Sequence, residues 1–330
     1  MLPRLVAAVS LVTCLAALAV GGTAAAEPAS GLDVTGWILS DGTVAQVDRN
    51  AGGLTTLSVD GLVLRGRGVT RPDQQMRRLA RAAHRDGLTS ELLVSNYSDR
   101  LGDFDPAALH RLLSEPARIA SVARQVSAAV QAGPWDGANV DLERVRRGDA
   151  AGLVSFVRHL QADLPASRTV SIDIGAATSL AAYRDEGCAL APLGRAADVI
   201  DLMTYDDHGP TWSEPGPIGP LPWQRAALGA LLRRVPAGRV QLGVAGYGYT
   251  WPAHGTGHDL TDAGARRLVR DDHATARWNR RAGEWTATLS DGTVLWWSDG
   301  RSYRLRERLA GAAGVRGLAV WRLGSADRLG

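Results

Sequence analysis

The sequence predicts an α/β fold, and within that class a (β/α)8 TIM barrel. Strand-like and helix-like segments alternate from Val34 to Trp321, which is typical of a parallel sheet with helical crossovers. About eight strands can be counted, and the region has roughly the 250 residues that such barrels need. No glycine-rich phosphate loop of the dinucleotide or P-loop kind is present, which disfavours the alternative, an open doubly wound sheet.

The expected strands are short apolar runs, and several of them end at a polar or aromatic residue. Trp37 lies in the first run, and Asp141 lies in the fourth. Runs of this length that are bounded by turn residues are typical of strands in a parallel sheet. The strands are expected at residues 34–39, 54–59 (a strand region that 62–64 would extend), 88–95, 135–144, 169–174, 198–205, 240–246 and 317–321.

Helix-like segments separate these strands. The segment at residues 72–85 begins with a proline and carries apolar Met76, Leu79 and Ala83 at helical spacing, as expected for a helix that packs on a sheet. Asp149 stands where it can cap another helix. Residues 42–53 are rich in turn-forming residues, and residues 175–197 are less regular and partly helical. The other helices are expected at residues 106–113, 116–131, 149–164, 223–235 and 303–313.

One region, residues 252–301, breaks the alternation. It contains a short helix at 262–269, which Thr261 can cap, and a hairpin of strands 284–289 and 293–297 joined by Ser290-Asp291-Gly292. A turn of this composition between two strand-like runs is a hairpin signal. We therefore expect a small α+β insertion between strands 7 and 8 of one catalytic barrel at residues 27–330.

Composition gives no sign of a nucleic-acid-binding protein. The formal net charge is only +3, and the hydrophobic fraction of 45% is ordinary for a globular chain. All 37 basic residues are arginine, which we interpret as base-composition bias in the gene. No basic cluster is interleaved with aromatic residues, so nucleic acid is not an expected partner.

The first 26 residues have the pattern of a secretory signal. Arg4 precedes an apolar run at residues 5–20, and small residues at 23–26 place the cleavage site before Glu27. The run is short for a membrane anchor, and a lipoprotein site at Cys14 is disfavoured because Cys14 lies inside the run. We expect a secreted, extracellular protein, either free or associated with the cell wall, without stable membrane insertion. Cys188 would then be the only cysteine, with no internal disulfide.

The sequence WDGANVDLER at residues 135–144 carries the strongest functional signal. On a strand, Asn139, Asp141 and Glu143 share one face, while the residues between them are apolar. Burying an amide and two carboxylates in a row costs free energy on a strand with both faces covered. The pattern therefore indicates a functional role and not a contribution to stability. The alternative is a chance pairing of acids on a solvated edge strand.

The spacing of the two acids suits acid catalysis. Same-face neighbours on a strand have Cβ atoms about 6.5–7 Å apart, so Asp141 and Glu143 are close enough to interact. Two nearby carboxylates resist double ionisation, and the pKa of one of them rises. A carboxyl group that stays protonated near neutral pH can act as a general acid.

Other candidate residues stand at the ends of expected strands. In (β/α)8 barrels the site lies at the C-terminal ends of the strands. Aromatic faces suit the apolar faces of sugar rings, and paired carboxyls suit the cleavage of glycosidic bonds. For a lone aromatic residue, core packing is the alternative. The residues at strand ends are Asn96, Glu143, Tyr205, Asp206, Tyr247 and Trp321.

Metal and serine-hydrolase chemistry are both disfavoured. His254 and His258 are four residues apart, but Gly255 and Gly257 make this segment a loop without an evident acidic third ligand. No GxSxG nucleophile elbow is present. We therefore expect no metal and no cofactor.

Several motifs together resemble a known family. The segment DGANVDLE resembles the DGxDxDxE signature of glycoside hydrolase family 18, the chitinase-like barrels. The segment DLMTYDDH resembles the sixth-strand MxYD element of that family, GVAGYGYTW its seventh-strand segment, and GLAVWRLGSAD its eighth-strand segment. The resemblance covers roughly Val34 to Asp327 and implies a (β/α)8 barrel with glycosidase activity.

The chain departs from the family signature at one position, where Asn139 replaces an aspartate. With the loop PGPIGPLPW and the ending WRLGSAD, it is more similar to the bacterial branch of spore-cortex and spore-germination hydrolases, the YaaH-like proteins. That branch acts on cell-wall glycans that contain N-acetylglucosamine. Asn139 cannot share a proton with Asp141 as an aspartate could.

The resemblance implies a substrate-assisted, retaining mechanism. Glu143 would protonate the glycosidic oxygen, and the substrate's own N-acetyl carbonyl would attack the sugar. Asp141 would orient the acetamido group, Tyr205 would hydrogen-bond to it, and Asn139 and Asp206 would support the site. The sugar-binding residues would be Trp321, Tyr247, Met203, Asn96 and Trp37.

The expected partner is a polysaccharide or oligosaccharide that contains N-acetylglucosamine, bound by a monomer. The residues do not separate chitin from peptidoglycan, or endo from exo cleavage. The alternative function is a catalytically silent, lectin-like barrel. The acid at Glu143 is retained in this chain, which favours the enzyme.

Overall fold

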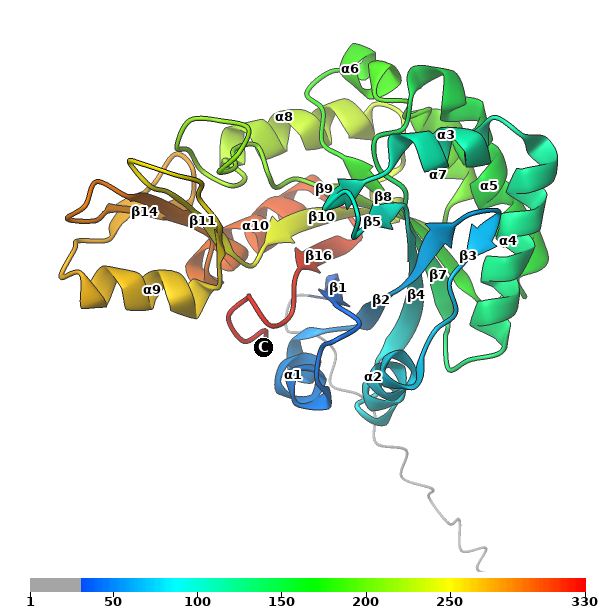
Figure 1. Cartoon of the computed structure of the whole chain (residues 1–330), viewed down its shortest axis with the longest axis horizontal. Helices are drawn as coiled ribbons and strands as arrows, with labels where there is room; N and C mark the ends of the chain where they lie inside the picture. Colours follow the sequence, from blue (N-terminus) through cyan, green and yellow to red (C-terminus); the bar gives the residue numbers. More distant parts are fainter. Residues whose placement is uncertain (1–30) are drawn as a thin grey trace, which may run out of the picture.

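The computed structural model describes residues 31–330 and confirms the (β/α)8 barrel. Its parallel strands close into a ring because β1 pairs with both β2 and β16 (Figure 1). The predicted export signal at residues 1–26 lies outside the described residues. The barrel strands are β1 (Asp33–Ile38), β2 (Thr56–Arg65), β4 (Thr89–Ser95), β7 (Gly137–Asp141), β8 (Thr169–Gly175), β9 (Val199–Met203), β10 (Val240–Ala245) and β16 (Gly317–Trp321).

The helices surround this ring. Several begin at residues whose side chains accept hydrogen bonds from the first turn, such as Asp73, Asp105 and Asp299. Between residues 31 and 330, no helix is long and apolar enough to cross a membrane. The helices around the barrel are α1 (Val44–Asn50), α2 (Gln74–Arg85), α3 (Pro106–Leu113), α4 (Pro116–Gln131), α5 (Ala150–Asp163), α6 (Leu180–Asp185), α7 (Leu190–Ala196), α8 (Leu221–Leu232) and α10 (Gly300–Ala313).

Two local expectations are corrected. The turn-rich segment at 42–53 contains helix α1, because Thr43 and Gln46 form a capping box that starts it. Asp149 stands at the beginning of α5, but its side chain makes no cap. Its carboxylate lies 2.9 Å from His110 Nδ1 instead, so a tertiary contact replaces the local one.

The insertion is a small α+β unit that projects beside the barrel (Figure 1). Its antiparallel sheet has the order β12-β11-β15-β14-β13. Its first strand begins at Gly248, four residues before the expected boundary. Leu260, Ala265, Leu295 and Trp297 form its own apolar core. Its elements are β11 (Gly248–Trp251), β12 (Asp259–Leu260), α9 (Asp262–Asp271), β13 (Arg277–Asn279), β14 (Glu284–Thr288) and β15 (Val294–Trp297).

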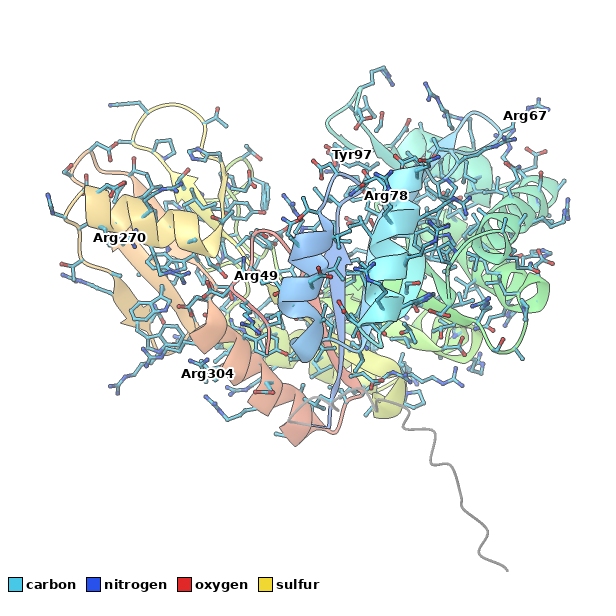
Figure 2. All side chains as sticks on the ribbon, turned by 90° about the horizontal axis from the view of Figure 1, so that it is seen from below. Arg49, Arg67, Arg78, Tyr97, Arg270 and Arg304 are labelled. Atoms are coloured by element: carbon cyan, nitrogen blue, oxygen red, sulfur yellow. The ribbon has the colours of Figure 1, made fainter. Side chains whose placement is uncertain are left out.

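Three further short strands extend the barrel rim. β3 (Gly68–Val69) pairs with the end of β2, and β5 (Tyr97–Ser98) pairs with β6 (Asp103–Phe104). Charged side chains are spread over the surface: Arg78 and Arg49 lie on the barrel side and Arg270 on the insertion (Figure 2).

The two faces of the barrel sheet differ in polarity. Ala138 and Val140 of β7 are fully buried in the main apolar core, where outward-facing strand residues meet the helices. The barrel interior is polar instead. Its buried polar residues include Thr35, Ser58, Glu91, Asn139, Ser171, Asp173, Asp201 and Gln241.

A buried ion pair joins the insertion to the barrel. Arg306 on α10 and Glu284 on β14 are each only 1% exposed, and their side chains meet at 3.0 Å. Glu284 also accepts hydrogen bonds from the main-chain N–H groups of Ile218 and Gly219, at 2.7 and 2.8 Å. Arg306 donates to the carbonyl of Gly219 and to Gln224 Oε1. This pair therefore holds the loop after β9 in place.

We predict that Arg306→Met lowers the free energy of unfolding by about 3–5 kcal/mol, because it leaves the Glu284 carboxylate buried without its partner. Urea unfolding followed by circular dichroism measures the change. The matched control is Arg308→Met on the same helix, where the exposed side chain predicts a change within about 0.5 kcal/mol. Equal effects of the two substitutions would contradict the prediction.

Candidate active site

The two predicted acids lie where β7 reaches the barrel mouth. Asp141 is the last residue of β7 and is 7% exposed, while Glu143 is half-buried just beyond the strand. The strand is thus shorter than the expected 135–144. Strand pairing therefore does not hold the main chain of Glu143. The side chain of Asn96, at the end of β4, holds it instead: its Oδ1 accepts from Glu143 N–H at 2.8 Å, and its Nδ2 donates to the Glu143 carbonyl at 3.0 Å.

The surroundings raise the pKa of both acids. Burial raises the pKa of Asp141 to about 7, with a further increase from the charge of Asp60, and the hydroxyl of Ser95 and the side chain of Glu143 moderate it. Burial raises the pKa of Glu143 well above its ordinary value, and the charges of Asp141 and Asp206 raise it further. The raised pKa suits Glu143 to the donation of a proton, and Asp141 beside it ionises near neutral pH.

Tyr205 lies among these acids. It follows β9 directly and is half-buried, and its ring stands 6.3 Å from that of Tyr247 at 74°. Burial raises the pKa of its hydroxyl well above the ordinary value, and the nearby carboxyls of Asp173, Asp206, Asp141 and Glu143 add to the shift. The hydroxyl thus stays protonated and can donate a hydrogen bond.

Asp206 stands at the rim and is held by two tyrosines. Its Oδ1 accepts from Tyr247 Oη at 2.5 Å and from Tyr249 Oη at 2.9 Å. Its backbone has φ = 63°, a left-handed conformation that is rare outside glycine and often marks functional sites. Tyr249 belongs to β11 of the insertion, and the sequence analysis did not select it.

The two predicted tryptophans lie at different depths. Trp321 ends β16 and is half-buried, with its ring 5.9 Å from that of Trp37. Trp37, on β1, is 1% exposed and donates from Nε1 to Asn139 Oδ1 at 2.8 Å. In this structure, therefore, Trp321 is accessible at the mouth, whereas Trp37 is packed behind it in the barrel interior.

Asn139 uses the full hydrogen-bonding capacity of its amide. Oδ1 accepts from Trp37 and from Ser58 Oγ, and Nδ2 donates to Ser171 Oγ at 2.9 Å and to Asp173 Oδ1 at 2.8 Å. None of these bonds goes to Asp141, whose buried Oδ1 has no hydrogen-bond partner within residues 31–330. Asn139 therefore ties together four strands and makes no hydrogen bond to Asp141.

The structure adds Asp173 to the site. Asp173 of β8 is 7% exposed and lines, together with Glu143 and Met203, a cavity of about 200 Å³. The sequence analysis did not select it, although Ser171 and Asp173 alternate on their strand as Asn139 and Asp141 do. Asn96, by contrast, lines a neighbouring cavity of about 430 Å³ beside Tyr97.

Within residues 31–330, no group of three or more histidine, cysteine, aspartate or glutamate residues is placed to hold a metal ion. His254 and His258 are both exposed. Cys188 is buried, and burial raises the pKa of its thiol to about 12, so it is a poor nucleophile.

A parallel barrel with paired carboxyls and aromatic residues at its C-terminal mouth is an arrangement suited to the cleavage of glycosidic bonds. Residues 67–326 match the family "Glycosyl hydrolases family 18". The chain therefore belongs to glycosyl hydrolase family 18.

Individual relatives agree with this assignment. The uncharacterized glycosylase YvbX of Bacillus subtilis is 25% identical over 242 residues, which cover 71% of this chain and 70% of YvbX. A chitinase from Chromobacterium violaceum is 25% identical, with a TM-score of 0.80 over 90% of this chain and 95% of that one. The spore cortex-lytic enzyme SleL of Bacillus cereus is 18% identical and shares the fold, with a TM-score of 0.80 over 89% of this chain and 71% of SleL.

We predict that Asn96→Ala lowers kcat by up to about 100-fold, the effect expected of a small displacement of a reacting group, because Glu143 loses two main-chain hydrogen bonds. Steady-state kinetics on a glycan substrate measures it, with KM little changed. Asn96→Asp keeps the acceptor for Glu143 N–H and should lose less. An unchanged kcat in folded Asn96→Ala would refute the prediction.

Proposed function

We propose that this protein hydrolyses β-linked glycans containing N-acetylglucosamine by substrate-assisted, retaining catalysis. The observation that carries the proposal is the pair of Asp141 and Glu143 at the barrel mouth, where burial raises the pKa of both carboxyls. Family membership supports the same reaction class.

In this mechanism Glu143 donates its proton to the glycosidic oxygen as the bond from that oxygen to C1 breaks. The carbonyl oxygen of the sugar's own acetamido group forms the new bond to C1, giving a cyclic oxazolinium ion. The Asp141 carboxylate accepts the acetamido N–H and stabilises the positive charge, while the Tyr205 hydroxyl donates to the acetamido oxygen. Water then attacks C1 and passes a proton to the Glu143 carboxylate, while the bond from C1 to the acetamido oxygen breaks and restores the neutral acetamido group, with net retention.

The relatives suggest the substrate class. The Chromobacterium violaceum protein is named a chitinase, and SleL is named a spore cortex-lytic enzyme. We propose that this protein acts outside the cell, as a monomer, on a cell-wall or chitin-type glycan. It would need no metal and no other cofactor.

A row of aromatic rings supports an extended sugar-binding cleft. From Tyr205 the row continues through Tyr247, which is packed in the interior and only 6% exposed, to Tyr249; the rings of Tyr247 and Tyr249 lie 5.4 Å apart. It ends at Trp212, which is 55% exposed and packs edge-on against Tyr249 at 5.9 Å. Sugar rings present apolar faces that stack on such side chains. The cleft would then run from the carboxyl pair toward the insertion.

We predict that Glu143→Gln lowers kcat by about 10²–10⁴-fold, the usual contribution of a general acid, without loss of folding or glycan binding. Turnover of a fluorogenic N-acetylglucosamine oligomer measures it. Glu115→Gln, an exposed carboxyl at the start of α4, is the control and should retain activity. Tight binding with equal, negligible turnover by wild type and Glu143→Gln would favour the lectin-like alternative.

We predict that kcat/KM falls about tenfold per pH unit below pH 7, because Asp141 must be ionised and its pKa is raised to about 7. An aspartate with the ordinary pKa of about 3.9 would stay ionised down to pH 4–5. The same limb should appear in a profile of kcat/KM against pH for Glu115→Gln. Full activity at pH 5 would rule out this role for Asp141.

We predict that Trp212→Ala raises KM about tenfold for a hexameric N-acetylglucosamine substrate but leaves KM unchanged for a disaccharide reporter, because only the longer glycan reaches the distal ring. One lost stacking contact corresponds to roughly 0.5–1.5 kcal/mol. Leu101→Ala, which removes another exposed apolar side chain (46% exposed), is the control. An equal effect on both substrates would argue against a distal sugar site at Trp212.

A further inference from the structure

A cavity lies outside the ring of strands, between α10 and the tail at residues 322–330. Its volume is about 260 Å³, and its lining includes Val244 of β10, Val320 of β16 and Tyr303 of α10. Val320 directly precedes Trp321 on β16, so the two side chains point to opposite faces of the sheet. The cavity is therefore separate from the barrel mouth, and the proposed reaction does not use it.

One end of this cavity contains a buried carboxyl group with an unpaired oxygen. Asp262, at the start of α9, is 1% exposed and lines the cavity. Its Oδ2 accepts from the main-chain N–H of Asp327 at 2.9 Å, whereas its Oδ1 has no hydrogen-bond partner among residues 31–330. A buried carboxyl oxygen without a partner costs free energy. A hydrogen-bond donor from a ligand would remove that cost.

The same end of the cavity has more carboxyl than guanidinium groups. Asp299 and Asp327 also line it, and Arg266 forms an ion pair with Asp327 and lies 3.9 Å from Asp299. One guanidinium group therefore faces three carboxyls. Burial raises the pKa of Asp262 well above its ordinary value, and the charges of Asp327 and Asp299 raise it further, against the lowering effects of the Asp327 N–H and of Arg266. A bound cation would offset this repulsion.

The walls of the cavity favour an organic cation. The described carboxyls are not placed in a group of three or more that could hold a metal ion. A single water needs only about 10–15 Å³ of such space, and the side chains of Val244, Val320 and Leu329 offer water no hydrogen bonds. An ammonium group on an alkyl chain satisfies both parts of the cavity, because its N–H donates to Asp262 Oδ1 and its methylene groups contact the apolar walls.

The cavity becomes basic away from Asp262. Arg304 lies four residues beyond Gly300, about 6 Å further along α10, and can be seen on that helix in Figure 2. Arg328 belongs to the part of the tail that leads toward α1. Both arginines are exposed and line the cavity, as does Glu307, so two guanidinium groups stand against one carboxyl here. Guanidinium groups bind carboxylates strongly, so this end suits a negatively charged group.

We propose that this cavity binds a small zwitterion, an alkyl chain with an ammonium group at one end and a carboxylate at the other. The ammonium group donates to Asp262 Oδ1, the chain lies against Val244 and Val320, and the carboxylate pairs with Arg304. A free ω-amino acid has this chemistry, and so does a lysine-type residue at the carboxyl end of a peptide. The site is independent of the proposed glycan hydrolysis, so its test needs no turnover.

The test is isothermal titration calorimetry of the full chain with 6-aminohexanoate at neutral pH and low salt. The wild type is expected to bind, and Asp262→Asn to bind at least about tenfold more weakly, because the amide keeps an acceptor for Asp327 N–H but removes the charge. Asp271→Asn, at an exposed position on the same helix, should bind like the wild type. No binding by the wild type at millimolar concentration, or equal affinity in Asp262→Asn, overturns the proposal.

Two comparison ligands separate the parts of the site. Hexanoate lacks the ammonium group, and pentylamine lacks the carboxylate. Arg304→Gln, at an exposed position, should weaken the binding of 6-aminohexanoate about threefold and leave the binding of pentylamine unchanged. If hexanoate binds as tightly as 6-aminohexanoate, the cavity selects only apolar chains and the proposal fails. This comparison uses the wild type, so it still decides if Asp262→Asn does not fold.

Nα-acetyl-lysine distinguishes the two sources of the ligand. It carries the side-chain ammonium group and a free carboxylate, as a lysine-type residue at the end of a peptide does. Binding as tight as that of 6-aminohexanoate supports the site and assigns it to a peptide end. Binding of 6-aminohexanoate alone supports the site and assigns it to a free amino acid.

Discussion

The active-site end of this barrel depends on one buried side-chain amide whose hydrogen-bond donors and acceptors are all paired. Asn139 joins β1, β2, β7 and β8 through hydrogen bonds to Trp37, Ser58, Ser171 and Asp173. A buried amide with both donors and both acceptors satisfied avoids the desolvation penalty of unpaired polar groups. It also fixes the orientation of β7 in the polar barrel interior. Asp141, two residues further on, is thereby held at the mouth without a bond to Asn139.

The mouth is then completed from two sides. On one side Asn96 binds the main chain of Glu143, so the acid is positioned although it lies beyond its strand. On the other side the Arg306–Glu284 pair holds the loop that follows Tyr205 and Asp206. Removing one partner of a buried pair costs far more than the intact pair contributes, so this side of the mouth is sensitive to single substitutions.

The fold and much of the site could be predicted because they rest on local patterns. Alternating strands and helices gave the barrel, and the polar face of residues 135–144 gave Asp141 and Glu143. Asp173 and Tyr249 were not found, since each is a single residue on a strand whose neighbours decide its role. The helix at Val44–Asn50 was missed because a capping box, not an apolar stripe, starts it.

The sequence by itself determined the class of barrel through the alternation of strands and helices, and the membership of glycosyl hydrolase family 18 through its motifs. It also determined the acidic pair, because spacing along the chain sets which residues share a strand face. Only the tertiary structure decided that Asn139 bonds away from Asp141, that Trp37 is buried behind Trp321, and that Asp173 meets Asp201. These contacts join residues that are between 28 and 284 positions apart in the chain. Their partners depend on strand register and burial, which no local pattern encodes.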